Sequence, residues 1–98
     1  MRKVIISNTV RDKIDELELF LKNDLNLSKK AASNRCDRMI KFLNSLHRNA
    51  DYPLCRFQRW QSLGYKCVVF EKSWIFAYEI VPEGIIIRDM SHTTALAD

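Results

Sequence analysis

The sequence predicts an α+β protein in which a helix hairpin packs on one face of a mainly antiparallel sheet. Residues 64–92 are dense in β-branched and aromatic residues and are interrupted at only two places, which is typical of three consecutive strands. Residues 10–46 instead repeat apolar residues at steps of three and four, which indicates amphipathic helices. The chain has 98 residues, 47% of them hydrophobic, so we expect one domain, residues 1–98, with the element order β-α-α-β-β-β.

The first strand and the first helix follow one another at the start of the chain. Lys3 to Ile6 is mostly apolar and predicts a strand, and Ser7-Asn8-Thr9 then offers three candidate N-caps. The turn-favouring residues from Asn23 to Asn26 predict the end of the helix. Between these limits one apolar stripe is formed by Val10, Ile14, Leu17, Leu21 and Leu25.

A second helix begins after Ser28, another candidate N-cap, and Tyr52-Pro53 prevents its continuation. Its apolar stripe consists of Ala32, Cys36, Met39, Ile40, Leu43 and Leu46. Two amphipathic helices joined by a short loop form an antiparallel hairpin. We expect the two stripes to bury against the apolar face of the sheet.

The segment Val81-Pro82-Glu83-Gly84 predicts a β-hairpin, because Pro suits a type I turn and Gly suits the positive φ that follows it. With a three-residue loop the predicted cross-strand pairs are Val81–Ile85, Ile80–Ile86, Tyr78–Arg88, Phe76–Met90 and Trp74–His92. Cross-strand partners share a face. One face then carries Trp74, Tyr78, Arg88 and His92. The other face carries Ile75, Ala77, Val81, Ile85 and Ile87. We assign the second, more apolar face to the core and the first to function.

The segment from Leu54 to Leu63 has no clear periodicity, so a loop, a helical turn and an irregular strand all remain open. It places Arg56 and Arg59 beside Phe57 and Trp60. Basic and aromatic residues together suit contact with RNA. Equally, the two aromatic residues can anchor the segment to the core while both arginines remain in solvent.

Several classes of protein are disfavoured by composition. Only Val4-Ile5-Ile6 follows the basic residues at the N-terminus, too short for a signal peptide, and no apolar run is long enough to span a membrane. The three cysteines lack Cys-x-x-Cys spacing, which argues against a disulfide framework and a zinc ribbon. We therefore expect a cytoplasmic protein without a metal site or other cofactor.

The charge of the chain is unevenly distributed. The net charge is +4, and within residues 28–48 a single acid, Asp37, accompanies the basic residues Lys29, Lys30, Arg35, Arg38, Lys41 and Arg48. Such a segment attracts phosphate chains or an acidic partner. The alternative is that these charges only form the solvated face of the helix.

The sequence resembles the RelE/ParE superfamily of bacterial type II toxins over nearly the whole chain. The matching segments are 46–53 (LHRNADYP), 64–66 (GYK), 75–78 (IFAY) and 87–92 (IRDMSH). Within the superfamily the chain is most similar to the YafQ-like branch, through Trp74 in the central strand and Arg88 four residues before His92. This resemblance implies a toxin that cleaves mRNA on the ribosome and is neutralised by a cognate antitoxin protein.

The resemblance also implies roles for individual residues. In this reaction the 2′-hydroxyl attacks the adjacent phosphate, so His92 is the candidate general acid or base and Arg88 the phosphate clamp. RNA binding would use Trp74 for base stacking, Tyr78 through its hydroxyl, and Lys66, Lys72, Arg56 and Arg59 through their charge. The hypothesis requires the indole, guanidinium and imidazole groups to project into one positively charged hollow. The structural alternatives are core packing of Trp74 and Tyr78, and an ion pair between Arg88 and Glu79 or Glu83.

Two other functions remain open. Most other residues expected of the nuclease branches are absent. For example, Ser73 precedes Trp74 where the YafQ-like branch carries an acidic residue. This motivates a ParE-like toxin that inhibits DNA gyrase by binding rather than by cutting RNA. A third hypothesis is an inactive member that retains only antitoxin binding.

Overall fold

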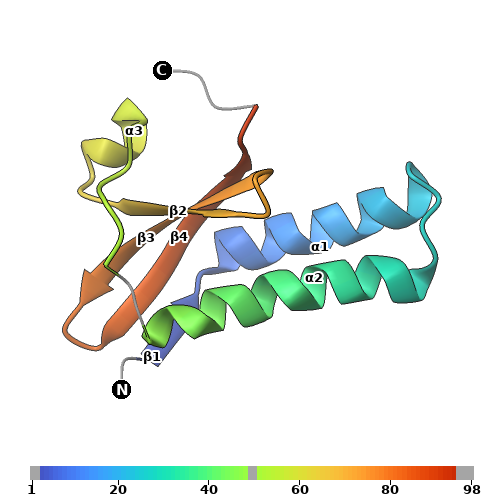
Figure 1. Ribbon diagram of the computed structural model, residues 1–98, viewed down its shortest axis with the longest axis horizontal. Helices are drawn as coiled ribbons and strands as arrows, with labels where there is room; N and C mark the ends of the chain where they lie inside the picture. The colour runs from blue at the N-terminus through green and yellow to red at the C-terminus, as the bar shows by residue number, and fades with distance from the viewer. Residues whose placement is uncertain (1–2, 49–50, 95–98) are drawn as a thin grey trace.

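The computed structural model describes residues 3–48 and 51–94, in which two long helices pack with a four-stranded mixed sheet (Figure 1). The elements are β1 (Lys3–Ile6), α1 (Asn8–Asn23), α2 (Lys29–Asn44), the 3-10 turn η1 (Ser45–His47), α3 (Gln58–Gln61), β2 (Lys66–Phe70), β3 (Trp74–Val81) and β4 (Gly84–His92). The predicted α+β class is confirmed. In space the strands lie in the order β1-β4-β3-β2, so the first strand is beside the last.

Serine hydroxyl groups fix the start of both long helices, as the sequence predicts. Ser7 Oγ accepts a hydrogen bond from the Val10 N–H group at 3.4 Å, and Ser28 Oγ accepts one from the Ala31 N–H group at 3.1 Å. Each bond satisfies an amide that would otherwise lack a partner in the first helical turn. The helices therefore begin one residue after each serine.

The helix hairpin begins the connection from β1, at one edge of the sheet, to β2, at the other edge, and the last strand, β4, returns to pair with β1 in parallel. Lys3 pairs with Gly84 and Ile6 with Ile87, and the Ser7 N–H group donates to the Ile87 carbonyl at 3.1 Å. Parallel strands require a crossover connection of a dozen or more residues. The helix α1 starts directly after β1 ends, so the chain passes from the sheet straight onto one of its faces. The helix hairpin lies against that face (Figure 1).

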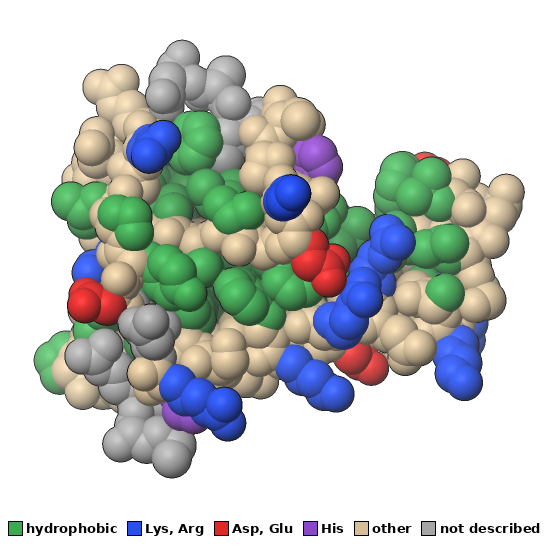
Figure 2. Space-filling view, in the orientation of Figure 1, with side chains coloured by type: hydrophobic (Ala, Val, Ile, Leu, Met, Phe, Trp, Pro, Cys, Tyr) green, Lys and Arg blue, Asp and Glu red, His purple; other side chains and the backbone are tan. Residues whose placement is uncertain are grey.

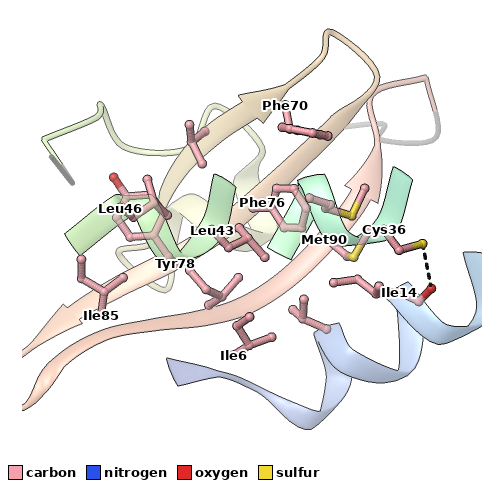
Figure 3. Packing of buried hydrophobic residues seen from close by; sticks show 14 of the residues in the cluster. Ile6, Ile14, Cys36, Leu43, Leu46, Phe70, Phe76, Tyr78, Ile85 and Met90 are labelled. Carbon is pink, nitrogen blue, oxygen red and sulfur yellow. Dashed lines mark hydrogen bonds between the residues drawn. The ribbon is translucent and has the colours of Figure 1, made fainter. Parts of the chain in front are cut away.

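The main core lies between the hairpin and this face of the sheet, which we call the inner face (Figure 3). Its fully buried side chains come from every layer, and the largest are Tyr78, Phe76, Met39, Leu43, Leu46, Ile85, Ile87, Met90 and Val10. Most of both predicted helix stripes are buried here. Leu25 is the exception: it follows the end of α1 and is 52% exposed, so its assignment to the stripe is wrong.

The strand register agrees with the prediction far from the turn and differs near it. Phe76 pairs with Met90 and Trp74 with His92, as predicted. Nearer the turn, however, Val81 pairs with Gly84 and Tyr78 with Ile87. The predicted partners, Ile85 and Arg88, each lie one residue further along β4 than the observed partners.

A β-bulge at Arg88 explains this difference. Tyr78 pairs with Ile87 and Ala77 with Asp89, so Arg88 is the extra residue of β4. The prediction placed the extra residue in the turn, next to Gly84, whereas the turn itself has only Pro82 and Glu83 between paired residues. A bulge redirects the neighbouring side chains, and the assignment of faces changes with it.

The opposite face of the sheet, the outer face, is covered by residues 54–65, which we call the outer segment. This segment contains the single turn α3 and is joined to β2 by a bridge between Leu54 and Lys66. Trp60 is 2% exposed and packs with Cys55, Ile75 and Ala77. In Figure 1, α3 lies on the side of the sheet away from α1 and α2. Of the open alternatives, a helical turn anchored by its aromatic residues is the one observed.

Two of the three cysteines form a disulfide, so the expectation that they remain unpaired is wrong. Cys55 and Cys67 are joined with their Cα atoms 4.8 Å apart, although 12 positions separate them in the sequence. Pairing of the outer segment with β2 brings them together, which spacing rules do not anticipate. Cys36 is free and buried, and its Sγ donates to the Ile14 carbonyl at 3.9 Å (Figure 3).

The predicted division of the sheet into a core face and a functional face is also wrong. Trp74 and Tyr78 lie on the inner face with Ile85 and Ile87, whereas Ile75 and Ala77 lie on the outer face. The register change near the turn places Ile85 and Ile87 on the face of the aromatic residues. Both faces are covered, so polarity alone does not identify the core.

The described residues contain no group of histidine, cysteine, aspartate or glutamate side chains arranged to hold a metal ion. Within the same ranges no helix has the length and apolar character needed to cross a membrane.

Candidate functional site

A groove lies at the end of the sheet where β3 begins and β4 ends. Trp74 and His92 are cross-strand partners there, and their rings meet edge to face with centroids 5.1 Å apart. The opposite wall is α1, which contributes Leu17 and Phe20. Two adjoining hollows of about 590 and 230 Å³ share these four residues. We call this feature the Trp74 groove.

The Trp74 groove has apolar walls and a mixed charged rim. Lys13 and Glu16 line the larger hollow, and Arg35 and Glu71 line the smaller one. Lys13 is already paired, because its Nζ donates to Asp89 Oδ1 at 2.6 Å and to the Met90 carbonyl at 3.1 Å. The groove is therefore not the strongly basic hollow that the nuclease hypothesis requires.

His92 is in contact with its neighbour Thr94 through one ring nitrogen. The Thr94 N–H group donates to His92 Nδ1 at 3.3 Å, and the Thr94 hydroxyl lies 2.7 Å from the same nitrogen. Because an amide N–H is always a donor, Nδ1 is the acceptor in this contact. Nδ1 is therefore engaged within the chain.

Arg88, the second predicted catalytic residue, lies on the other side of the sheet from His92. Its Nε donates to Glu79 Oε1 at 2.7 Å, and its NH2 group contacts the same oxygen. Glu79 follows Tyr78 in β3 and so points to the outer face. The expectation that Arg88 and His92 share a face is wrong, because the bulge falls at Arg88 itself. The alternative ion pair with Glu79 is the arrangement observed.

The other predicted RNA-binding residues do not gather around His92. Tyr78 is 0% exposed in the main core, so its hydroxyl cannot reach a bound strand. Lys66 is the cross-strand partner of Tyr78, and its Nζ lies 3.9 Å from Asp51 Oδ1. Lys72 is exposed in the turn before Trp74, and its carbonyl accepts from the Thr93 hydroxyl at 3.2 Å. Of these residues, only Lys72 lies at the same end of the sheet as Trp74.

The two arginines of the outer segment are exposed but lie on the outer face. The Arg59 guanidinium stacks over the Trp60 ring at 5.2 Å and lies 3.8 Å from Asp89 Oδ2. Arg56 is exposed in the same segment. Both are therefore on the opposite side of the sheet from Trp74 and His92, and they do not extend that site.

The basic residues of α2 form a separate surface. Lys and Arg side chains gather along this helix in the view of Figure 2. Arg38 lies 3.6 Å from Glu71, and its side chain is 58% exposed. An exposed pair of this kind contributes little to stability. The exposed basic face of α2 fits both sequence-based alternatives, and contact with a phosphate chain or an acidic partner stays a prediction.

Sequence reasoning did not identify the α1 wall of the groove. Phe20 lies outside the apolar stripe of α1 and is 45% exposed, beside Leu19 at 56%. The available signal for a contact surface was the presence of large apolar residues outside the apolar stripe of an amphipathic helix. Their partners in β3 and β4 could not be named without the register.

Burial of Tyr78 predicts a loss of stability at alkaline pH. Burial raises the pKa of Tyr78 from 10.0 to about 12, despite a hydrogen bond with the backbone of Tyr52 that lowers it. The unfolded chain therefore loses this proton first as the pH rises, and the folded state becomes less favoured between pH 10 and 12. We expect a fall of roughly 1.4 kcal/mol per pH unit from this group. Denaturant unfolding at several pH values measures it.

Tyr78→Phe is the matched control for this prediction, because it keeps the ring and removes the titrating hydroxyl. The difference between the two unfolding free energies should be constant below pH 9 and shrink above pH 10. A constant difference up to pH 12 would show that Tyr78 keeps its ordinary pKa.

Comparison with protein-family models gives no match for this chain, and comparison with curated proteins gives none at a significant level.

Proposed function

We propose that this protein is the toxin of a type II toxin-antitoxin system and that it acts by binding its target rather than by cutting RNA. One observation carries the second part: Arg88 is paired with Glu79 on the outer face, whereas His92 lies beside Trp74 on the inner face. The toxin identity rests on the sequence resemblance to the RelE/ParE superfamily. The choice of mechanism rests on geometry.

RNA cleavage by 2′-hydroxyl attack needs a proton acceptor, a proton donor and positive charge at the phosphate. His92 supplies one proton-transfer group, but its Nδ1 is occupied by Thr94. The Arg88 charge is neutralised by Glu79 and faces away. The separation of Arg88 from His92 favours the ParE-like alternative, in which the toxin inhibits DNA gyrase by binding and breaks no covalent bond.

The binding surface we assign to the target is the free end of the helix hairpin together with the Trp74 groove. Leu19, Phe20 and Leu25 expose 56%, 45% and 52% of their surface there. Exposed apolar residues that adjoin a groove are typical of protein contact sites. A cognate antitoxin, expected to be partly disordered and acidic, would neutralise the toxin by folding over the same surface.

A supercoiling assay with purified DNA gyrase tests this proposal. The purified protein should block supercoiling, and Phe20→Ser should raise the concentration needed by roughly tenfold, since anchors of this kind contribute more than 1 kcal/mol. Leu63→Ser is the matched control, because Leu63 is 61% exposed but belongs to the outer segment. Inhibition should survive Arg88→Ala, because Arg88 lies on the outer face, away from the assigned surface.

Two outcomes contradict the binding mechanism. Gyrase that is unaffected by the wild-type protein removes gyrase as the target. New 5′ ends inside coding regions after induction, lost with His92→Ala, would instead favour the ribosome-dependent nuclease. Normal growth on induction without an antitoxin would contradict the toxin identity itself.

A further inference from the structure

The disulfide lies where the outer segment joins β2. The Cys55 N–H group donates to the Tyr65 carbonyl at 2.9 Å, and the Cys67 N–H group donates to the Pro53 carbonyl at 3.3 Å. These bonds make a short antiparallel ladder around the bridged pair Leu54–Lys66, and the disulfide joins the residues that follow each member of that pair. The cross-link therefore closes the outer segment into a covalent loop.

Besides the cross-link, the backbone ladder and side-chain packing hold this loop on the outer face. Its α3 helix is a single turn, too short to be stable alone. The Arg59–Asp89 pair is long, at 3.8 Å, and the Arg59 side chain is 62% exposed, so its contribution is small. Trp60 packs on Ile75 and Ala77, with Phe57 and Tyr65 against the same cluster. The cross-link ties the segment that carries Trp60 covalently to β2.

The two sulfur atoms differ in access. Cys55 is 1% exposed beneath Trp60, whereas Cys67 is partly exposed on β2. Thiolates cleave disulfides by attacking one sulfur directly, and access decides which sulfur is attacked. Cys67 is the sulfur that an external thiolate reaches first.

We propose that the Cys55–Cys67 disulfide is a reducible latch, opened by a dithiol that attacks Cys67, and that its opening releases the outer segment and Trp60 from the outer face. This inference does not depend on the proposed toxin function. It adds a redox-sensitive site to the molecule.

The exchange proceeds in two balanced steps. One thiolate of the dithiol forms a bond to Cys67 Sγ, and the Cys55–Cys67 bond breaks with Cys55 leaving as a thiolate that takes up a proton. The second thiol of the dithiol loses its proton and attacks its own mixed disulfide, which releases Cys67. Two electrons and two protons pass from the dithiol to the cysteine pair, and the dithiol becomes a disulfide.

The first test identifies the attacked sulfur. The folded protein is treated with a limiting monothiol, 2-mercaptoethanol, quenched with acid and mapped by peptide mass spectrometry. We expect at least tenfold more mixed disulfide on Cys67 than on Cys55. Equal labelling, or labelling mainly on Cys55, would overturn the proposed direction of attack. Cys36 is the internal control for folding: it is 5% exposed, burial raises its pKa, and alkylation should leave it unmodified.

The second test follows Trp60 itself. In a Trp74→Phe background Trp60 is the one remaining tryptophan of the chain. Dithiothreitol, a dithiol, should shift its emission to longer wavelength, with loss of the shift on reoxidation. The Cys55→Ala, Cys67→Ala variant should show the shifted emission from the start and no response to dithiothreitol. If reduction produces free thiols at Cys55 and Cys67 but the Trp60 emission is unchanged, the proposed release of the outer segment is overturned.

Discussion

Replacing Gly84 with alanine is expected to lower the free energy of unfolding by about 3 kcal/mol or more. Gly84 has a φ of +151°, a region that residues with a side chain rarely adopt. A Cβ at this position would also overlap the carbonyl oxygen of Lys3, its partner in β1. The methyl group can be accommodated only if β1 moves away from β4. Urea denaturation measures the loss.

Gly64→Ala is the matched control for this prediction. Gly64 also has a positive φ, +75°, but a Cβ there would meet no atom within 4 Å. It should therefore lose only the cost of the backbone conformation, about 1 kcal/mol. Similar losses for both variants would mean that conformation, rather than the close approach of β1, accounts for the Gly84 effect.

The local elements were predictable because each is determined by neighbouring residues. Ser7, one of three candidate caps, and Ser28 each lie shortly before residues with helical apolar spacing, and both cap helices. Pro82 and Gly84 likewise determine a turn within a few residues. Signals of this kind need no knowledge of distant parts of the chain.

The registers of the paired strands depend on contacts that the sequence does not reveal. A bulge adds one residue to a strand, and the alternation of residues in β4 does not say whether that residue lies at the turn or at Arg88. Distant pairs such as Trp74–His92 are the same in both cases, and they were predicted correctly. The direction of Arg88 differs between the two cases, so the catalytic pair could not be decided from sequence.

The faces were misassigned because a short, aperiodic segment covers one of them. Ile75 and Ala77 suggested the main core, but Trp60 and Cys55 cover them instead. The register change adds to this error, because it places Ile85 and Ile87 with Tyr78 on the inner face. The outer segment covers the outer face because it pairs with β2, and that tertiary pairing has no local sequence signal.

Removing the cross-link is the second change with a large expected effect. The Cys55→Ala, Cys67→Ala variant should unfold with a free energy about 3 kcal/mol lower than the wild type. The physical reason is that the disulfide joins residues 12 positions apart and restricts the unfolded chain, which gains conformational freedom when the bond is absent. The measurement is guanidinium or urea unfolding of both proteins under non-reducing conditions.

Dithiothreitol separates this effect from that of the substitutions. It should lower the stability of the wild type to that of the double variant and leave the variant unchanged, because only the wild type carries a bond to reduce. A loss under about 1 kcal/mol would contradict an entropic role for the loop. Since Trp60 seals the outer face from within that loop, a small loss would mean that packing on Ile75 and Ala77 suffices to hold the segment. The emission of Trp60 in the reduced, folded protein reports separately whether the outer face stays covered.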